Sequence, residues 1–132
     1  MITVYNINDE DHSSSPNDYY IGRGSILGNP YTHIKDRQTK AFYIVGTREE
    51  AIERYGHYFD VMYTTNDAFR EKVDEIYDKY KSGVDVFLGC YCKPLACHGD
   101  VIAEKLQERL IKEKITEAKL KNHEKKKFSN IS

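Results

Sequence analysis

The stretch VDVFLGCYCKPLACHGD, residues 84–100, decides the fold. Its first six residues form an apolar run that ends at Gly89, which is typical of a buried β-strand. Two segments with helical spacing of apolar residues precede this run, and a third follows it. Because helices lie on both sides in sequence, we predict that the strand runs parallel to its neighbours in an α/β domain.

The segments before this strand carry their own signals. Residues 2–7 alternate and are β-branched, which predicts a first strand, and the polar residues 8–18 predict a loop. Two short strands are expected in residues 31–46, around a turn at 36–38, as a hairpin. Thr47 and Glu50 have the spacing of a capping box, which predicts that a helix begins there.

The second and third helices complete the predicted architecture. The second begins near Asn66 and is stopped by Gly83, and the third begins at about His98 and should project and fray beyond Ile115. We therefore predict a small Rossmann-like three-layer unit with a mostly parallel sheet, a short hairpin and about three helices. A single domain is expected over residues 1–115, followed by a Lys-rich C-terminal helix extension or tail over 116–132.

Composition and charge limit the function classes. The chain has 132 residues and a net charge of -1, which argues against a protein that coats nucleic acid. Residues 111–132 carry 7 Lys and 3 Glu, so weak contact with nucleic acid through this tail is a minority alternative. No apolar run approaches the roughly 18–20 residues that span a bilayer. No secretory signal is recognisable either, which predicts a cytoplasmic location.

Residues 20–30, YIGRGSILGNP, resemble an anion-binding loop in composition. Gly22, Gly24 and Gly28 leave room for a ligand against the main chain, and the guanidinium of Arg23 suits phosphate or carboxylate. The segment is neither a P-loop nor a dinucleotide fingerprint. The alternative is a turn-rich connection in which Arg23 forms an ion pair. Since residues 20–30 and 90–100 each follow an apparent strand, we predict that they lie side by side in one crevice.

The three cysteines all lie in residues 90–100 and are predicted to be reduced. Zinc binding by Cys90, Cys92, Cys97 and His98 is one interpretation, but the cramped spacing argues against it. In a second, Cys97 is a reactive thiol whose pKa is lowered at a helix amino terminus, with His98 as base. In a third, backbone amides at the helix start bind a ligand that Gly99 admits.

Two further alternatives remain open in this segment. Cys90 and Cys92 could be small buried hydrophobic residues at a strand end. Asp100 could cap the helix, as carboxylates in a first turn often do. Its functional alternative is a contact to a ribose hydroxyl or a general acid/base role.

Taken together, these motifs resemble the domain-of-unknown-function 4326 family. The resemblance rests on YIGRGS…LGNP at 20–30, TREEAIERY at 47–55 and LGCYCKPLACHGD at 88–100, and it covers about residues 1–110. This chain has Tyr91 where the family often has Trp, and longer stretches at 8–18 and 31–46. The resemblance implies a bacteriophage or bacterial origin and no established reaction.

We therefore expect a domain that binds, and acts enzymatically on, a nucleotide or nucleoside-derived molecule, for instance at a glycosidic bond. The alternatives are a phage protein that sequesters a host signalling nucleotide or inhibits a host protein, and a small zinc-stabilised module. No metal or cofactor is expected, homo-oligomerisation is left open, and a phage-encoded chain would lie in the host cytoplasm. The expected catalytic residues are Cys97, His98 and Asp100, and the expected ligand-binding residues are Tyr20, Gly22, Arg23, Gly24, Ser25, Gly28, Asn29, Cys90 and Gly99.

Overall fold

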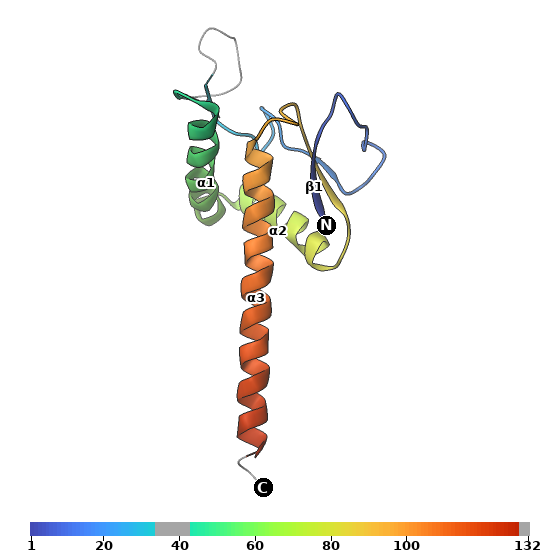
Figure 1. The fold of residues 1–132 in the computed structure, drawn as a ribbon, viewed down its shortest axis with the longest axis vertical. Helices are drawn as coiled ribbons and strands as arrows, with labels where there is room; N and C mark the ends of the chain where they lie inside the picture. The colour runs from blue at the N-terminus through green and yellow to red at the C-terminus, as the bar shows by residue number, and fades with distance from the viewer. Residues whose placement is uncertain (34–42, 130–132) are drawn as a thin grey trace.

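The computed structural model describes residues 1–33 and 43–129 (Figure 1). Five strands and three helices make up this part of the chain, which confirms the predicted α/β class. In chain order they are β1 (Ile2–Asn6), β2 (Asp18–Tyr20), β3 (Tyr31–Thr32), β4 (Tyr43–Ile44), α1 (Arg48–Thr65), α2 (Asp67–Lys81), β5 (Val86–Cys90) and α3 (His98–Ser129).

The main sheet has the strand order β1-β5-β2, and both strand pairs are parallel, as predicted for the apolar run. In register, Asn6 lies beside Cys90, and Tyr20 lies beside Gly89. The carboxyl ends of all three strands therefore meet at one edge of the sheet. In open α/β sheets this edge is where ligands bind.

The expected hairpin in residues 31–46 is wrong. β3 and β4 pair in parallel. The amide of Tyr43 donates to the Pro30 carbonyl (3.0 Å), and that of Val45 donates to the Thr32 carbonyl (2.7 Å). A hairpin needs antiparallel strands. The turn predicted at residues 36–38 lies outside the described residues.

The helices cover one face of the main sheet. Val86 and Leu88, on that face of β5, join the apolar residues of all three helices in one core. On the opposite face, the ring of Phe87 stacks on His12, with 4.0 Å between centroids. The second covering layer is thus a loop, and not the helical layer expected of a Rossmann-like three-layer unit. The reason is that β1 and β2 are joined by residues 7–17, which contain no helix.

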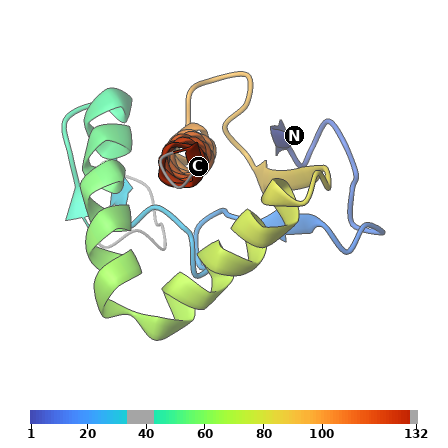
Figure 2. The same ribbon diagram turned by 90° about the horizontal axis from the view of Figure 1, so that it is seen from below.

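The three helices pack together beside the sheet. Figure 2 looks along α3, which stands between α1 and the sheet, while α2 crosses from the end of α1 toward β5. Their starts follow the predicted signals: the Thr47 hydroxyl accepts from the Glu50 amide (3.0 Å), and the Asn66 side chain accepts from the Phe69 amide (2.9 Å). α2 ends just before Gly83, whose φ is +93°.

α3 continues well past the core, as a long helix that projects from the body of the molecule (Figure 1). Within residues 98–123, for which burial is described, the last buried residue of α3 is Leu106, and Ile111, Ile115 and Leu120 are all exposed. None of the described helices is long and apolar enough to cross a membrane. The apolar side chains in this part of α3 therefore contact little of the folded body.

Truncation after Ala118 should leave the melting temperature within about 3 °C of the full chain, because exposed positions contribute less than about 0.5 kcal/mol. Thermal melting followed by circular dichroism measures this. Leu106→Ala is the control: its side chain is 1% exposed, and its loss should lower the melting temperature by on the order of 10 °C. A comparable drop in the truncated chain would show that the projecting part docks on the body or on a second copy.

Candidate functional site

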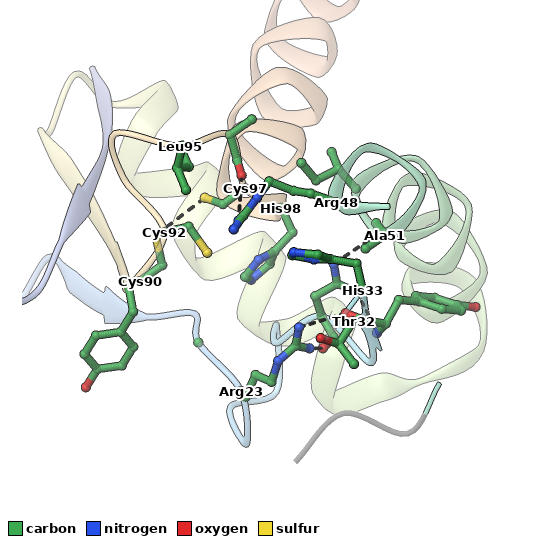
Figure 3. A pocket seen from close by; sticks show the side chains of 16 residues that line it. Arg23, Thr32, His33, Arg48, Ala51, Cys90, Cys92, Leu95, Cys97 and His98 are labelled. Atoms are coloured by element: carbon green, nitrogen blue, oxygen red, sulfur yellow. Dashed lines mark hydrogen bonds between the residues drawn. The ribbon is translucent and has the colours of Figure 1, made fainter. Parts of the chain in front are cut away.

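A pocket of about 390 Å³ opens at the carboxyl edge of the sheet (Figure 3). We call it the carboxyl-edge pocket. Residues from both predicted segments line it, which confirms that these segments lie side by side. The lining residues are Gly22, Arg23, Asn29, Tyr31, Thr32, His33, Arg48, Ala51, Ile52, Cys90, Tyr91, Cys92, Leu95, Ala96, Cys97 and His98.

The structure brings half of the expected site residues into this pocket. Those that line it are Gly22, Arg23, Asn29, Cys90, Cys97 and His98. The lining does not include Tyr20, Gly24, Ser25, Gly28, Gly99 or Asp100. Most residues of this second set have a visible structural use, as the following contacts show.

Arg23 clamps residues 20–30, which we call the glycine loop. Its two terminal guanidinium nitrogens donate to the main-chain carbonyls of Asn29 and Tyr31, the second at 2.8 Å. It forms no ion pair among the described residues, so the alternative of a buried ion pair is not what holds it. Burial lowers the pKa of this guanidinium. Arg23 therefore orders the loop and also brings positive charge to the pocket wall.

The loop is fastened to α1 by two buried hydrogen bonds. The Asn29 side-chain amide donates to the Ala51 carbonyl (3.1 Å), and the Tyr55 hydroxyl donates to the Leu27 carbonyl (2.6 Å). Glycine is required at position 28 for a steric reason, because a Cβ there would lie 2.6 Å from the carbonyl oxygen of Gly22. These contacts give the loop one conformation over the start of α1.

Tyr20, the last residue of β2, and Ser25 form hydrogen bonds with the main chain of the loop. The Tyr20 hydroxyl donates to the Arg23 carbonyl (3.1 Å), and the Ser25 hydroxyl donates to the Gly22 carbonyl (2.6 Å). Their side chains are thus engaged with the main chain of residues 22–25. Neither of them lines the pocket.

The three cysteine sulfurs gather at one wall of the pocket (Figure 3). All three Sγ atoms lie within 4.8 Å of one another, and those of Cys90 and Cys97 are 3.5 Å apart. Cys90 and Cys97 are buried, and Cys92 is half-buried. A tight turn brings the chain back, in which the Leu95 amide donates to the Cys92 carbonyl (2.8 Å). The short sequence spacing therefore still allows all three sulfurs to meet.

The second interpretation predicts a lowered pKa for Cys97, whereas the groups around this thiol act in the opposite direction. Hydrogen bonds with Cys90 and Cys92, followed by burial, raise the pKa of the Cys97 thiol. The pKa of Cys92 is lowered instead, first by hydrogen bonds from Cys90 and Cys97 and then by the nearby Arg48 guanidinium.

His98, the first residue of α3, is almost fully buried. Its Nε2 donates to the Ile21 carbonyl (2.6 Å), which ties the helix start to the end of β2. Burial lowers the pKa of the ring and keeps the imidazole neutral. A neutral ring that donates from Nε2 has no proton on Nδ1. The ring also packs edge-on against Tyr55, with 4.9 Å between centroids.

Asp100 caps α3. One carboxylate oxygen accepts from the Cys97 amide (3.2 Å), and the other accepts from the Lys93 ammonium (2.5 Å). Gly99 allows the helix to approach the sheet, since a Cβ would lie 2.7 Å from Val4 Cγ1 and 2.8 Å from Ile21 Cδ1. The close approach predicted at Gly99 is therefore between helix and sheet.

Sequence reasoning missed Arg48. Its side chain points into the pocket toward the cysteines (Figure 3), and its guanidinium lies 3.4 Å from the Ala96 carbonyl. The available signal was its place as the first residue of α1, because a cation at a helix amino terminus opposes the helix dipole. The position of Arg48 therefore suggests that its guanidinium has a role other than stabilising the helix. No carboxylate is among the residues that line the pocket.

The comparisons with known proteins identify the family. The model of the family described as Domain of unknown function (DUF4326) matches residues 5–108, most of the chain, so the protein belongs to this family. No curated protein and no solved structure matches the chain. The matched region contains every residue that lines the carboxyl-edge pocket.

Proposed function

We propose that the protein binds a small organic anion of the nucleotide or nucleoside-derived class in the carboxyl-edge pocket. One observation carries the proposal: the guanidinium groups of Arg23 and Arg48 line the pocket, and none of its lining residues is acidic. The chain as a whole has a net charge of -1, so this positive wall is local. Arginine is well suited to phosphate because its planar fork can donate two parallel hydrogen bonds.

The size and the aromatic lining support a ligand that also carries a base. A volume of about 390 Å³ falls in the usual range of small-molecule sites, about 300–1,000 Å³. Tyr31 and Tyr91 bring aromatic rings to the lining, and Tyr91 is 58% exposed. Such rings can stack on a nucleobase without selecting a sequence or a particular base.

The proposal extends to an enzymatic action on the bound molecule. Its support is the concentration of Cys92, Cys97 and His98 at one end of the pocket, which is richer than capture of an anion requires. A protein that only sequesters a nucleotide would use the same guanidinium groups without turnover. Product analysis by chromatography after incubation with each molecule that binds separates the two. The phage setting and the cytoplasmic location remain predictions from the family resemblance and the sequence.

Arg48→Ala should weaken binding of phosphate-bearing nucleotides by about 10–150-fold, the effect of losing one charge-assisted contact of about 1.5–3 kcal/mol. Isothermal titration calorimetry with nucleosides and their mono- and diphosphates measures this. Stability should change little, because the hydrogen bond from Arg48 to the Ala96 carbonyl is long (3.4 Å) and exposed. Arg23 is a poorer test, since its removal also frees the loop that it clamps.

The matched control is Arg54→Ala. Arg54 lies on the same helix, outside the pocket, in an exposed pair with Glu50 (3.1 Å), and such pairs contribute little stability. This variant should bind every nucleotide as the wild type does. The proposal is overturned if no member of the panel binds, if nucleosides bind as tightly as their phosphates, or if Arg48→Ala and Arg54→Ala bind alike.

A further inference from the structure

The wall of three cysteines has the dimensions of a metal site. Three sulfurs that each lie about 2.3 Å from a tetrahedral zinc ion are separated by about 3.8 Å. Here, all three Sγ atoms lie within 4.8 Å of one another, and one pair is at 3.5 Å. A shared metal ion explains why three sulfurs from a strand end, a turn and a helix start meet at one place. Three free thiols would gain no comparable stabilisation from meeting there.

We propose that Cys90, Cys92 and Cys97 bind one zinc ion through their sulfurs and leave its fourth coordination position open to the carboxyl-edge pocket. One feature of the protein supports the open position. Among the described residues, no other metal-ligating side chain joins this cluster. Three protein ligands with one open position are the arrangement of catalytic zinc sites.

The chemistry of the donors favours zinc over the alternatives. Thiolates are soft ligands that select zinc, copper(I) or iron–sulfur clusters. A four-iron cluster holds its cysteine sulfurs farther apart than a single ion does, so the observed separations fit one ion. The cramped spacing that argues against zinc in the sequence applies to closed four-ligand sites built from two pairs. It does not apply to a three-ligand site closed by the turn at Cys92–Leu95.

The surrounding charge fits the same site. A zinc ion with three thiolates carries one net negative charge, and the Arg48 guanidinium lies beside it (Figure 3). The amino terminus of α3, which begins directly after Cys97, adds partial positive charge there. With Arg23 also in the wall, the pocket keeps a net positive charge when zinc is bound. The metal site thus deepens the proposed function. It rests on that function only for the identity of the ligand that would approach the open position.

Metal analysis of the full chain, purified with reductant and without added metal, tests the site. We expect about one zinc per chain by mass spectrometry of the elements. Replacement by cobalt(II) should give the intense visible bands of a tetrahedral ion and a thiolate-to-cobalt charge-transfer band. Cys92→Ser should weaken zinc binding by more than the roughly 10–100-fold that loss of an outer-shell partner costs. The matched control, Tyr91→Phe, changes the adjacent exposed residue and should retain the metal.

Two further measurements keep the proposal falsifiable if Cys92→Ser folds poorly. Chelation of wild-type protein should lower its melting temperature, and added zinc should restore it. X-ray absorption of the zinc form should show three sulfurs at about 2.3 Å and one lighter atom. Thiocyanate should change the cobalt spectrum, because an open position admits an exogenous ligand.

The proposal is overturned if the purified chain holds no metal and takes up neither zinc nor cobalt with its thiols reduced. It is also overturned if Cys92→Ser binds zinc as the wild type does, or if four sulfurs or two nitrogens surround the ion. Nucleotide titrations on metal-free protein separate this outcome from that of the proposed function. Binding of nucleotides without any metal uptake would retain the pocket and remove the zinc site.

Discussion

Tyr55→Ala is expected to lower the free energy of unfolding by about 3–5 kcal/mol, the usual cost of deleting a buried aromatic side chain. The Tyr55 side chain is fully buried at the centre of the core. It touches both halves of the site: its hydroxyl donates to the Leu27 carbonyl (2.6 Å), and its ring packs against His98. The variant should therefore lose the order of the glycine loop and of the α3 start together.

Tyr55→Phe separates the hydrogen bond from the packing. The ring stays, and the loss of about 1–3 kcal/mol is the cost of leaving the buried Leu27 carbonyl without a donor. Tyr58→Phe is the matched control on the next turn of α1, where the ring contacts Tyr55 and Phe69 and the hydroxyl forms no hydrogen bond with the described residues. Urea unfolding measures all three variants. Equal stability of Tyr55→Phe and Tyr58→Phe would contradict the role given to the Tyr55 hydroxyl.

The elements that could be predicted from the sequence are those with local causes. The starts of α1 and α2 follow from side chains that accept amides within the same turn, at Thr47 and Asn66. The apolar run that becomes β5 is buried because its neighbours in sequence are helices that cover it. Gly83 ends α2 because its positive φ is readily adopted only by glycine. Each of these causes lies within a few residues of its effect.

The features that could not be predicted depend on distant partners. The parallel pairing of β3 with β4 places Tyr31 beside Tyr43, a choice that the local pattern does not distinguish from a hairpin. The loop that covers the second face of the sheet depends on the stacking of His12 on Phe87, 75 positions apart in the chain. Arg48 enters the site because α1 packs where the loop before α3 ends.

The roles of the thiols also depend on packing. Position alone suggested Cys97 as the reactive group, since it immediately precedes α3. In the structure Cys97 is buried against Cys90, and Cys92 lies near the Arg48 guanidinium instead. Asp100 illustrates the opposite case, because the capping role that its position suggests is the one observed. The position at a helix start was thus enough to predict the capping role of Asp100, whereas the pKa of the Cys97 thiol depends on the side chains packed around it.

Adding one methyl group at Gly28 is the strongest small change with which to test the site, because the nearest atoms to a Cβ there belong to the main chain. An added Cβ would lie 2.6 Å from the Gly22 carbonyl oxygen and 3.1 Å from that of Ser25. Neither atom can move without moving the loop that Arg23 clamps and that Tyr55 fastens to α1. A side-chain neighbour could rotate away, whereas here the loop itself must shift.

Gly28→Ala should therefore destabilise the fold by about 1–3 kcal/mol through overpacking, and by about 1–3 kcal/mol more if the displaced Leu27 carbonyl leaves the Tyr55 hydroxyl unpaired. Gly56→Ala should act in the opposite direction, because Gly56 lies inside α1 and its added Cβ would meet only Val101 Cγ1 at 3.8 Å. That change should stabilise the protein by about 0.5–1 kcal/mol. Urea unfolding gives both signs, and nucleotide titration should show loss of binding only in Gly28→Ala. Intact binding and stability in Gly28→Ala would mean that the loop does not shape the pocket.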